Sequence, residues 1–172
     1  FLEYPMVLPR KLIKPLTRKG FTKLADEHNW LLNEERPRVV DGVATAAAEG
    51  DRSENAEYIY GKKRMREIDK RLRYLTSLLK DVQIVDPERL FGDTVVFGAT
   101  VVVRGDDGKE NRWTIVGEGE ADYKEASISW KSPVGKALLN KKVGDFVVVE
   151  RPAGETEYEI CDILYAGRPY QD

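Results

Sequence analysis

The chain has 172 residues, of which 41% are hydrophobic, so it is long enough to bury a core as one ordinary domain or two small ones. No apolar stretch reaches the roughly 18 residues that a transmembrane helix requires. A single cysteine, Cys161, excludes an internal disulfide, and the lone His28 excludes a multi-histidine metal site or a catalytic triad. We therefore expect a soluble cytoplasmic protein with no membrane partner and without most familiar hydrolase chemistry.

Charge and composition divide the chain near residue 85. Residues 1–85 contain 17 Lys and Arg against 13 Asp and Glu, whereas residues 86–172 contain 11 against 17. The basic half favours contact with a polyanion, while the acidic half argues against nucleic acid and leaves protein recognition open. We predict an N-terminal extension over residues 1–16, which lacks the apolar run of a secretory signal and has no assigned role, followed by domains over residues 17–85 and 86–172.

The first predicted helix begins after Thr17, a residue suited to an N-cap, and ends at Gly50. Pro37 falls inside this helix and has no N–H to donate, so we expect it to bend the helix or to remove one backbone hydrogen bond. The residues at helical spacing are Phe21, Leu24, His28, Leu31, Leu32, Val39, Val43, Ala46 and Ala47.

The second predicted helix has the apolar spacing of a coiled coil, with Gly61 as its one weak point. Its seam residues alternate in steps of three and four: Tyr58, Gly61, Met65, Ile68, Leu72, Leu75, Leu79 and Val82. Because only a few residues separate the two helices, we predict an antiparallel hairpin. About thirty helical residues give an arm of roughly 45 Å, which is too long for the core of a small globule, so we expect it to project.

Residues 86–172 are typical of a compact, mostly antiparallel sheet with one short helix. Asp106-Asp107-Gly108 predicts a hairpin turn, and Ser132-Pro133 predicts the start of the helix. The predicted strands cover residues 95–97, 100–103, 113–116, 127–130, 146–149 and 157–165. The chain is therefore expected to be of the α+β class.

Two acids, Asp51 and Glu54, lie at the expected tip of the hairpin. In a structural interpretation, Asp51 caps the second helix and Glu54 bonds back to the N–H of the cap, as in a capping box. In a functional interpretation, both carboxylates are hard oxygen ligands for Mg²⁺. Two carboxylates are too few for a complete magnesium site, so a partner would supply the remaining ligands and the chemistry.

Seven cations follow the tip within twelve residues, from Lys62 to Arg73. A solvated coiled-coil face is one explanation of such a run. Alternatively, cations along the approach to a phosphodiester hold a nucleic acid strand by its phosphates. The candidate contacts are Arg52, Lys62, Lys63, Arg66, Lys70 and Arg73.

Several segments in one order, from about Thr17 to Tyr165, resemble the bacterial Gre transcript-cleavage factors and their GreB branch in particular. The density of cations after the tip favours that branch. The matching residues are Glu35-Arg36-Pro37, residues 50–58, residues 62–69, Arg73-Tyr74-Leu75, Phe97-Gly98-Ala99, Ile115-Val116-Gly117, Ser132-Pro133, Ala137-Leu138-Leu139, Val143-Gly144-Asp145 and Pro152-Ala153-Gly154-Glu155.

The resemblance implies a coiled coil that enters the secondary channel of a backtracked RNA polymerase and an FKBP-like C-terminal domain that docks at the channel mouth. The family's tip acids fall on Asp51 and Glu54, which would share Mg²⁺ with the polymerase, with Ser53 and Asn55 as supports. The polymerase would then cleave its own extruded RNA. The protein itself would be a monomer without a resident cofactor or self-contained catalysis.

The resemblance places a polymerase-docking contact at Lys131, Ser132 and Pro133. GreB-type proteins usually carry an acid where this chain has Lys131, so the charge of the docking contact is reversed.

Three other functions are compatible with the sequence. A channel-occupying regulator would compete or inhibit without cleavage, although the retained acids at 51 and 54 count against it. A stand-alone RNA-binding arm would use the basic face of the second helix. A peptidyl-prolyl isomerase rests on fold analogy alone, and fold does not carry activity.

Overall fold

The computed structural model describes residue 8, residues 11–50 and residues 54–169. The chain divides into two compact units: a hairpin unit, Phe21–Asp81, and a sheet unit that combines the described part of Phe1–Gly20 with the chain from Val82 onward. The two boundaries between the units, after Gly20 and after Asp81, fall within residues 17–85, the range that the composition predicts for the hairpin domain. Within the described residues, no helix has both the length and the apolar character that a membrane crossing requires.

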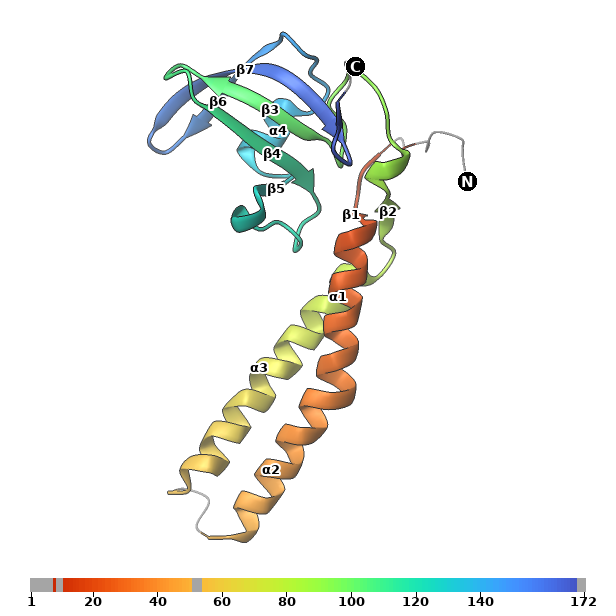
Figure 1. Ribbon diagram of the computed structural model, residues 1–172. Helices are drawn as coiled ribbons and strands as arrows, with labels where there is room; N and C mark the ends of the chain where they lie inside the picture. The colour runs from red at the N-terminus through yellow and green to blue at the C-terminus, as the bar shows by residue number, and fades with distance from the viewer. Residues whose placement is uncertain (1–7, 9–10, 51–53, 170–172) are drawn as a thin grey trace. The chain divides into compact units, whose positions relative to one another are not determined.

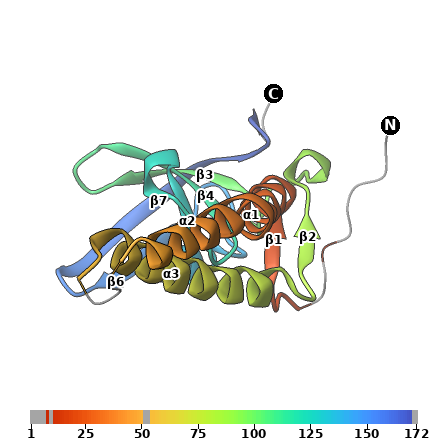
Figure 2. The same cartoon turned by 90° about the horizontal axis from the view of Figure 1, so that it is seen from below.

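The hairpin unit consists of two antiparallel helical segments, as the sequence predicts (Figure 1; Figure 2). The first segment comprises α1 (Arg18–Trp30), a π-helical turn (Leu31–Glu35) and α2 (Arg36–Ala48), and the second is α3 (Ala56–Leu79). The predicted cap is confirmed, because the Thr17 hydroxyl accepts the Gly20 N–H at 3.0 Å.

The disturbance expected at Pro37 takes the form of the π-helical turn that precedes it. In a regular α-helix the proline ring would clash with the carbonyl four residues earlier. This turn of the helix instead contains one extra residue, so the Arg36 N–H donates to the Leu31 carbonyl five residues back rather than to a carbonyl four residues back. The same turn directs Glu35 into the hairpin, where this acid is only 7% exposed.

The seam between the two segments follows the predicted spacing. On α3 the buried residues are Gly61, Ile68 and Leu75, which are seven residues apart. Facing them, the buried apolar residues of the first segment are Leu24, Leu31, Val39 and Ala46. Burial of a leucine or isoleucine contributes about 1.5–3 kcal/mol, so Ile68 and Leu75, at 1% and 0% exposure, are the main anchors of the pairing.

A two-stranded parallel sheet, which the sequence analysis missed, joins chain segments on either side of the hairpin. It pairs β1 (Pro15–Thr17) with β2 (Gln83–Val85). Glu120 also bonds to β1, accepting the Thr17 N–H at 2.9 Å and the Thr17 hydroxyl at 2.6 Å. Thr17 and Glu120 both belong to the sheet unit, so these bonds hold β1 within that unit.

The main sheet of the sheet unit has six strands, in the order β5-β4-β3-β7-β6, with β8 beside β7. All of its neighbours are antiparallel except β4 and β5. The strands are β3 (Thr100–Gly105), β4 (Glu110–Val116), β5 (Ser127–Ser129), β6 (Phe146–Arg151), β7 (Gly154–Tyr165) and β8 (Arg168–Pro169); the helices are α4 (Pro133–Leu138) and the 3-10 turns Pro87–Arg89 and Tyr123–Glu125.

Five of the six predicted strands are confirmed, and so are the short helix and the turn at 106–108, where Gly108 has a φ of +78°. The predicted strand at 95–97 is wrong. Val95 and Phe97 are buried, but the Val95 N–H donates to the Lys141 carbonyl and the chain then turns at Gly98, which has a φ of +94°. These apolar side chains therefore fill the core from a loop.

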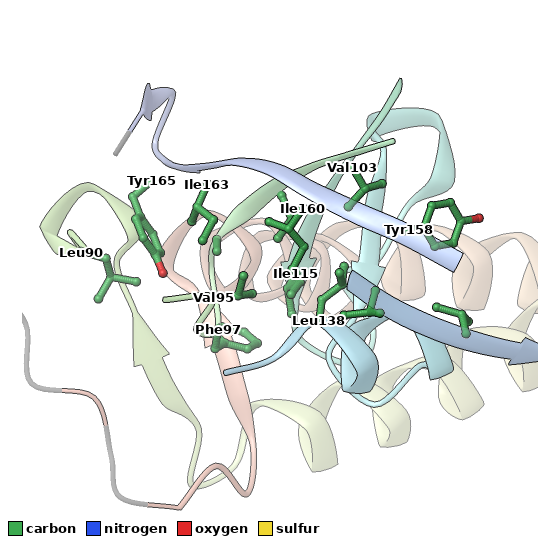
Figure 3. Packing of buried hydrophobic residues seen from close by; sticks show 14 of the residues in the cluster. Leu90, Val95, Phe97, Val103, Ile115, Leu138, Tyr158, Ile160, Ile163 and Tyr165 are labelled. Atoms are coloured by element: carbon green, nitrogen blue, oxygen red, sulfur yellow. The ribbon is translucent and has the colours of Figure 1, made fainter. Parts of the chain in front are cut away.

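The core of the sheet unit lies between the sheet and the segments packed on its inner face. Figure 3 shows Phe97 and Val95 gathered with Ile115, Leu138 and Ile160, and each of these five is at most 1% exposed. Leu138 comes from the short helix α4, so this helix is held by its apolar face.

Candidate functional site on the helical hairpin

The tip of the hairpin is held by Asn55. Its side-chain oxygen accepts the Tyr58 N–H at 3.1 Å, which makes Asn55 the N-cap of α3, and its amide nitrogen donates to the Ala46 carbonyl of α2 at 2.8 Å. One side chain therefore starts α3 and ties it to the end of α2. The capping role considered for Asp51 is wrong, because the helix begins four residues later than that cap requires.

The other tip residues differ in what the structure describes. Asp51, Arg52 and Ser53 lie outside the described residues. Glu54 immediately precedes the cap and is exposed, and no hydrogen bond or ion pair joins its side chain to another described residue. Because Asn55 performs the capping, the Glu54 carboxylate remains available to a ligand, and it lies where the helix dipole favours negative charge.

The described residues contain no group of three or more His, Cys, Asp and Glu side chains that could hold a metal ion. Glu54 fits a magnesium ligand in its chemistry and exposure, since Mg²⁺ prefers carboxylate and water oxygens. One or two carboxylates of this kind leave most of the six coordination positions to other donors.

The seven cations of α3 fall into two groups with different surroundings. Arg64 lies 3.4 Å from Glu35 and 3.6 Å from Glu67, and Arg71 binds both oxygens of Glu27, at 2.7 and 2.8 Å. These two arginines are partly buried and hold the helices together. The remaining five, here called the basic stripe, are exposed and have no ion pair with any described residue: Lys62, Lys63, Arg66, Lys70 and Arg73.

The basic stripe lies along one side of α3. Lys62, Arg66, Lys70 and Arg73 follow one another in steps of four, four and three residues, which places them on one helical face about 17 Å long. Exposed ammonium and guanidinium groups in a row are suited to the phosphates of a single strand, because each contact releases counterions. The α3 residues singled out from the sequence are thus the ones that structural ion pairs leave available.

Ion pairs across the hairpin perturb the acids that take part in them. The hydrogen bond from Arg71 lowers the pKa of Glu27 below its usual 4.5, and its charge adds to the effect. Arg36 likewise lowers the pKa of Asp69, whose carboxylate lies 2.8 Å from the guanidinium. His28 contacts the Thr76 hydroxyl at 3.1 Å and so belongs to the same set of cross-helix contacts.

The predicted docking residues lie where β5 leads into α4. The Ser132 hydroxyl accepts the Gly135 N–H at 3.0 Å and donates to the Ser129 carbonyl at 2.6 Å, so it is engaged in capping α4. Lys131 is exposed, lies 3.4 Å from Glu118 and stands 5.6 Å from the centre of the Trp130 ring. Lys131 and Pro133 are therefore the exposed members of the trio.

A groove between α2 and α3, which the sequence analysis did not predict, has a volume of about 360 Å³. The small residues Gly42, Ala56 and Gly61 are the sequence signal that could have indicated it. Its lining residues are Glu35, Arg38, Val39, Gly42, Val43, Ala56, Glu57, Tyr60, Gly61 and Arg64.

Comparisons with known proteins match both halves of the chain. Residues 14–84 match the family described as "Transcription elongation factor, N-terminal", and residues 90–165 match "Transcription elongation factor, GreA/GreB, C-term". The protein named transcription elongation factor GreB of Neisseria meningitidis serogroup B is 48% identical over 151 residues, or 87% of this chain and 93% of that protein. The GreB of Yersinia pestis is 46% identical over 157 residues, or 91% of each.

Among solved structures, the GreA factor homolog 1 (Gfh1) of Thermus thermophilus is similar to this chain. The two share 23% sequence identity with a TM-score of 0.40, over 90% of this chain and 99% of that chain.

Proposed function

Since the chain belongs to the GreA/GreB family of transcription elongation factors and to its GreB branch, we propose that it enters the secondary channel of RNA polymerase and stimulates cleavage of the extruded RNA in backtracked complexes. The polymerase would perform the hydrolysis, and this chain would contribute side chains to it. We propose that the protein acts as a monomer in the bacterial cytoplasm, where its polymerase works.

The observation that carries the proposal is the division of roles at the tip. Asn55 caps α3 and bonds to α2, which fixes the backbone beside Glu54 and leaves the Glu54 carboxylate exposed. A side chain that is positioned but not engaged in structure is suited to complete a partner's site. Asp51, with Ser53 as a support, is the second proposed tip acid.

Asp51 and Glu54 would hold Mg²⁺ together with acids of the polymerase. When bound there, Mg²⁺ supplies activation of the water that hydrolyses a phosphodiester bond. The two residues contribute negative charge and oxygen donors, and the hairpin carries them to the bond. No cofactor is proposed to reside on this chain alone.

The basic stripe would hold the extruded RNA as it passes along α3, with Arg52 as a further contact at the tip. Its five cations are exposed, and four of them follow one another along one face, which supports contact with successive phosphates. Such contacts favour longer extruded RNAs, because more phosphates reach the stripe. Lys131, Ser132 and Pro133 would contact the polymerase at the channel mouth.

The direct experiment mixes the protein with stalled, backtracked complexes of its cognate polymerase and follows RNA cleavage. We expect wild-type protein to stimulate cleavage and Glu54→Gln to lose about tenfold or more of the stimulated rate. Glu49→Gln, which changes an exposed acid at the end of α2, is the matched control and should keep the wild-type rate.

Two outcomes of that experiment favour other functions. RNA that stays uncut while the protein occupies the polymerase would identify an inhibitor or competitor. Tight RNA binding without polymerase, together with no cleavage, would identify a stand-alone RNA-binding arm.

The basic stripe is tested in the same assay by charge removal. The double variant Lys62→Gln with Lys63→Gln should need a several-fold higher concentration on long extruded RNAs, and the difference should shrink as salt increases. Lys19→Gln with Lys23→Gln, which alters exposed lysines of α1, should match wild type. Equal behaviour of both double variants at every salt concentration would mean that the stripe is only a solvated face.

A further inference from the structure

The outer face of β6 and β7 carries large apolar side chains that are open to solvent. Side chains alternate along a strand, so Phe146 and Val148 lie on the face opposite the buried Val147. Phe146 is 61% exposed and Val148 is 51% exposed. In the described sheet β6 is an edge strand, and β3 pairs with β7 only from Tyr158 onward, so β6 and the start of β7 form a two-stranded ribbon. This face is therefore accessible to a partner.

Four glutamates surround these apolar side chains on the same face. Glu159 and Glu157 are the cross-strand partners of the two apolar residues, and Glu150 and Glu155 face each other at the next pair on this face. None of the four carboxylates has an ion pair with a described residue. Like charges directly opposite each other destabilise a sheet, so these acids do not serve the strand pairing, and a cationic partner would relieve their repulsion. We call this surface the acidic sheet face: Phe146, Val148, Glu150, Glu155, Glu157 and Glu159.

The basic stripe of α3 has the matching chemistry and spacing. Lys62, Arg66 and Lys70 follow one another in steps of four residues, or about 6 Å along the helix axis. The acids of β7 follow one another in steps of two residues, or about 7 Å along the strand, so three cation–carboxylate pairs stay within about 2 Å of register. Ile59, which is 52% exposed, precedes Lys62 by three residues and Lys63 by four, so it adds an apolar group to the same helical face.

A second copy of the chain is the partner that this complementarity favours. The negative charge of the acidic sheet face repels nucleic acid and attracts a cationic surface. Every copy carries such a surface in its basic stripe, whose five cations have no ion pair with any described residue.

We propose that the acidic sheet face binds the basic stripe of a second copy of this chain. The stripe cations pair with the glutamates of β7, and Ile59 packs against Phe146. The contact is heterologous, because it joins two different surfaces, so it sets no fixed stoichiometry. Exposed ion pairs are individually weak and are screened by salt, so the association is reversible and belongs to low ionic strength.

This association and RNA binding exclude each other. A stripe that is covered by the sheet face of another copy cannot contact phosphates, so RNA competes with the second copy. The single chain remains the form that acts on polymerase, because its stripe is free. The competition with RNA rests on the proposed function, whereas the association itself does not.

The first experiment measures the average mass of the full-length protein by sedimentation equilibrium over a range of concentrations, at about 0.05 M and about 1 M salt. At low salt the mass should exceed that of one chain and rise with concentration, and at high salt it should be that of one chain. A mass of one chain at every concentration in low salt would overturn the proposal.

Charge reversal on each surface identifies the pairing. Glu155→Lys with Glu157→Lys makes the sheet face basic, and Arg66→Glu with Lys70→Glu makes the stripe acidic. Each double variant alone should stay a single chain at low salt, because its two surfaces now carry the same sign. An equimolar mixture of the two should recover association, because each reversed surface meets its complement on the other variant. A mixture that stays a single chain would overturn the proposal.

Matched variants outside the two surfaces serve as controls. Glu88→Lys with Glu125→Lys makes the same change of net charge at exposed acids of the sheet unit and should associate as wild type does. Phe146→Ala should weaken association several-fold, whereas Tyr123→Ala, which removes a ring that is 85% exposed elsewhere on the sheet unit, should not. Equal effects of these two alanine variants would overturn the proposed contact.

RNA and the cleavage assay keep the two proposals distinct. A single-stranded oligouridylate should dissociate the wild-type assemblies at low salt, and assemblies that bind it without dissociating would overturn the stripe as the contact. If association follows the charge reversals but cleavage is not stimulated, the proposed function falls alone. If cleavage is stimulated and the protein stays a single chain at low salt, only the association falls.

Discussion

The close approach of the two helices at Gly61 gives the sharpest test of the hairpin's packing. A Cβ built at Gly61 would lie 2.5 Å from Cγ2 of Val43 on the facing helix. Ordinary carbon–carbon contacts are about 3.5–4.0 Å, so Gly61→Ala forces an overlap of about 1 Å onto a β-branched side chain with few alternative rotamers.

The expected cost follows from two opposing terms. Overpacking of this kind costs about 1–3 kcal/mol, while replacing a helical glycine by alanine stabilises by about 0.5–1 kcal/mol. Gly61→Ala should therefore lower the free energy of unfolding of the hairpin by up to about 2.5 kcal/mol. Gly42→Ala, on the facing helix, meets no atom within 4 Å and should raise that free energy by about 0.5–1 kcal/mol.

The assay is urea unfolding followed by far-ultraviolet circular dichroism, with hydrogen exchange of the α3 amides to assign the transition to the hairpin unit. Val43→Ala removes the clashing methyl group and should recover part of the stability lost in Gly61→Ala. Equal stabilisation by Gly61→Ala and Gly42→Ala would refute the inference that the helices touch at Gly61.

Three further predictions concern named side chains. Asn55→Ala removes the cap of α3 and the bond to α2, so it should destabilise the hairpin by about 1 kcal/mol in urea unfolding and reduce stimulated cleavage; an unchanged unfolding midpoint would contradict the cap. Because Arg71 lowers the pKa of Glu27, the stabilisation by this pair is present above about pH 4.5 and is lost as pH falls through the lowered pKa. Glu27→Gln should therefore lower the free energy of unfolding by less than about 1 kcal/mol at neutral pH and should leave it unchanged in acid. A difference between variant and wild type that does not depend on pH would count against the pair. Ser132→Ala should destabilise the sheet unit by about 1 kcal/mol through loss of the α4 cap, as measured by the unfolding transition of the sheet unit. If Ser132 served only to contact the polymerase, the substitution would leave that transition unchanged.

The hairpin could be predicted from the sequence because its buried positions repeat at a period that only a helix pair satisfies. Ile68 and Leu75 lie seven residues apart, and the structure buries both. The parallel pairing of Pro15–Thr17 with Gln83–Val85 could not be predicted, since three-residue strands far apart in the chain leave no periodic signal. The buried run at 95–97 has strand composition but bonds its backbone to a loop, which composition does not reveal.

The sequence predicts which residue types lie at the tip and along α3, but it does not predict the contacts that they make. The sequence could not assign the cap to Asn55 over Asp51, because both residue types are good caps and the helix start decides between them. The candidate RNA contacts chosen from the sequence already leave out Arg64 and Arg71, but the sequence could not show which residues pair with them, because their partners Glu35 and Glu27 lie on the facing segment. The groove escaped prediction because it forms only when the two helices pair.

The most direct test of the central claim compares cleavage and binding for Asp51→Asn on the same backtracked complex. If the tip acids act on the chemistry of the polymerase, this variant should lose nearly all stimulated cleavage while its affinity for the complex stays within a few-fold of wild type. A parallel loss of affinity and cleavage, or full cleavage by the variant, would contradict the account.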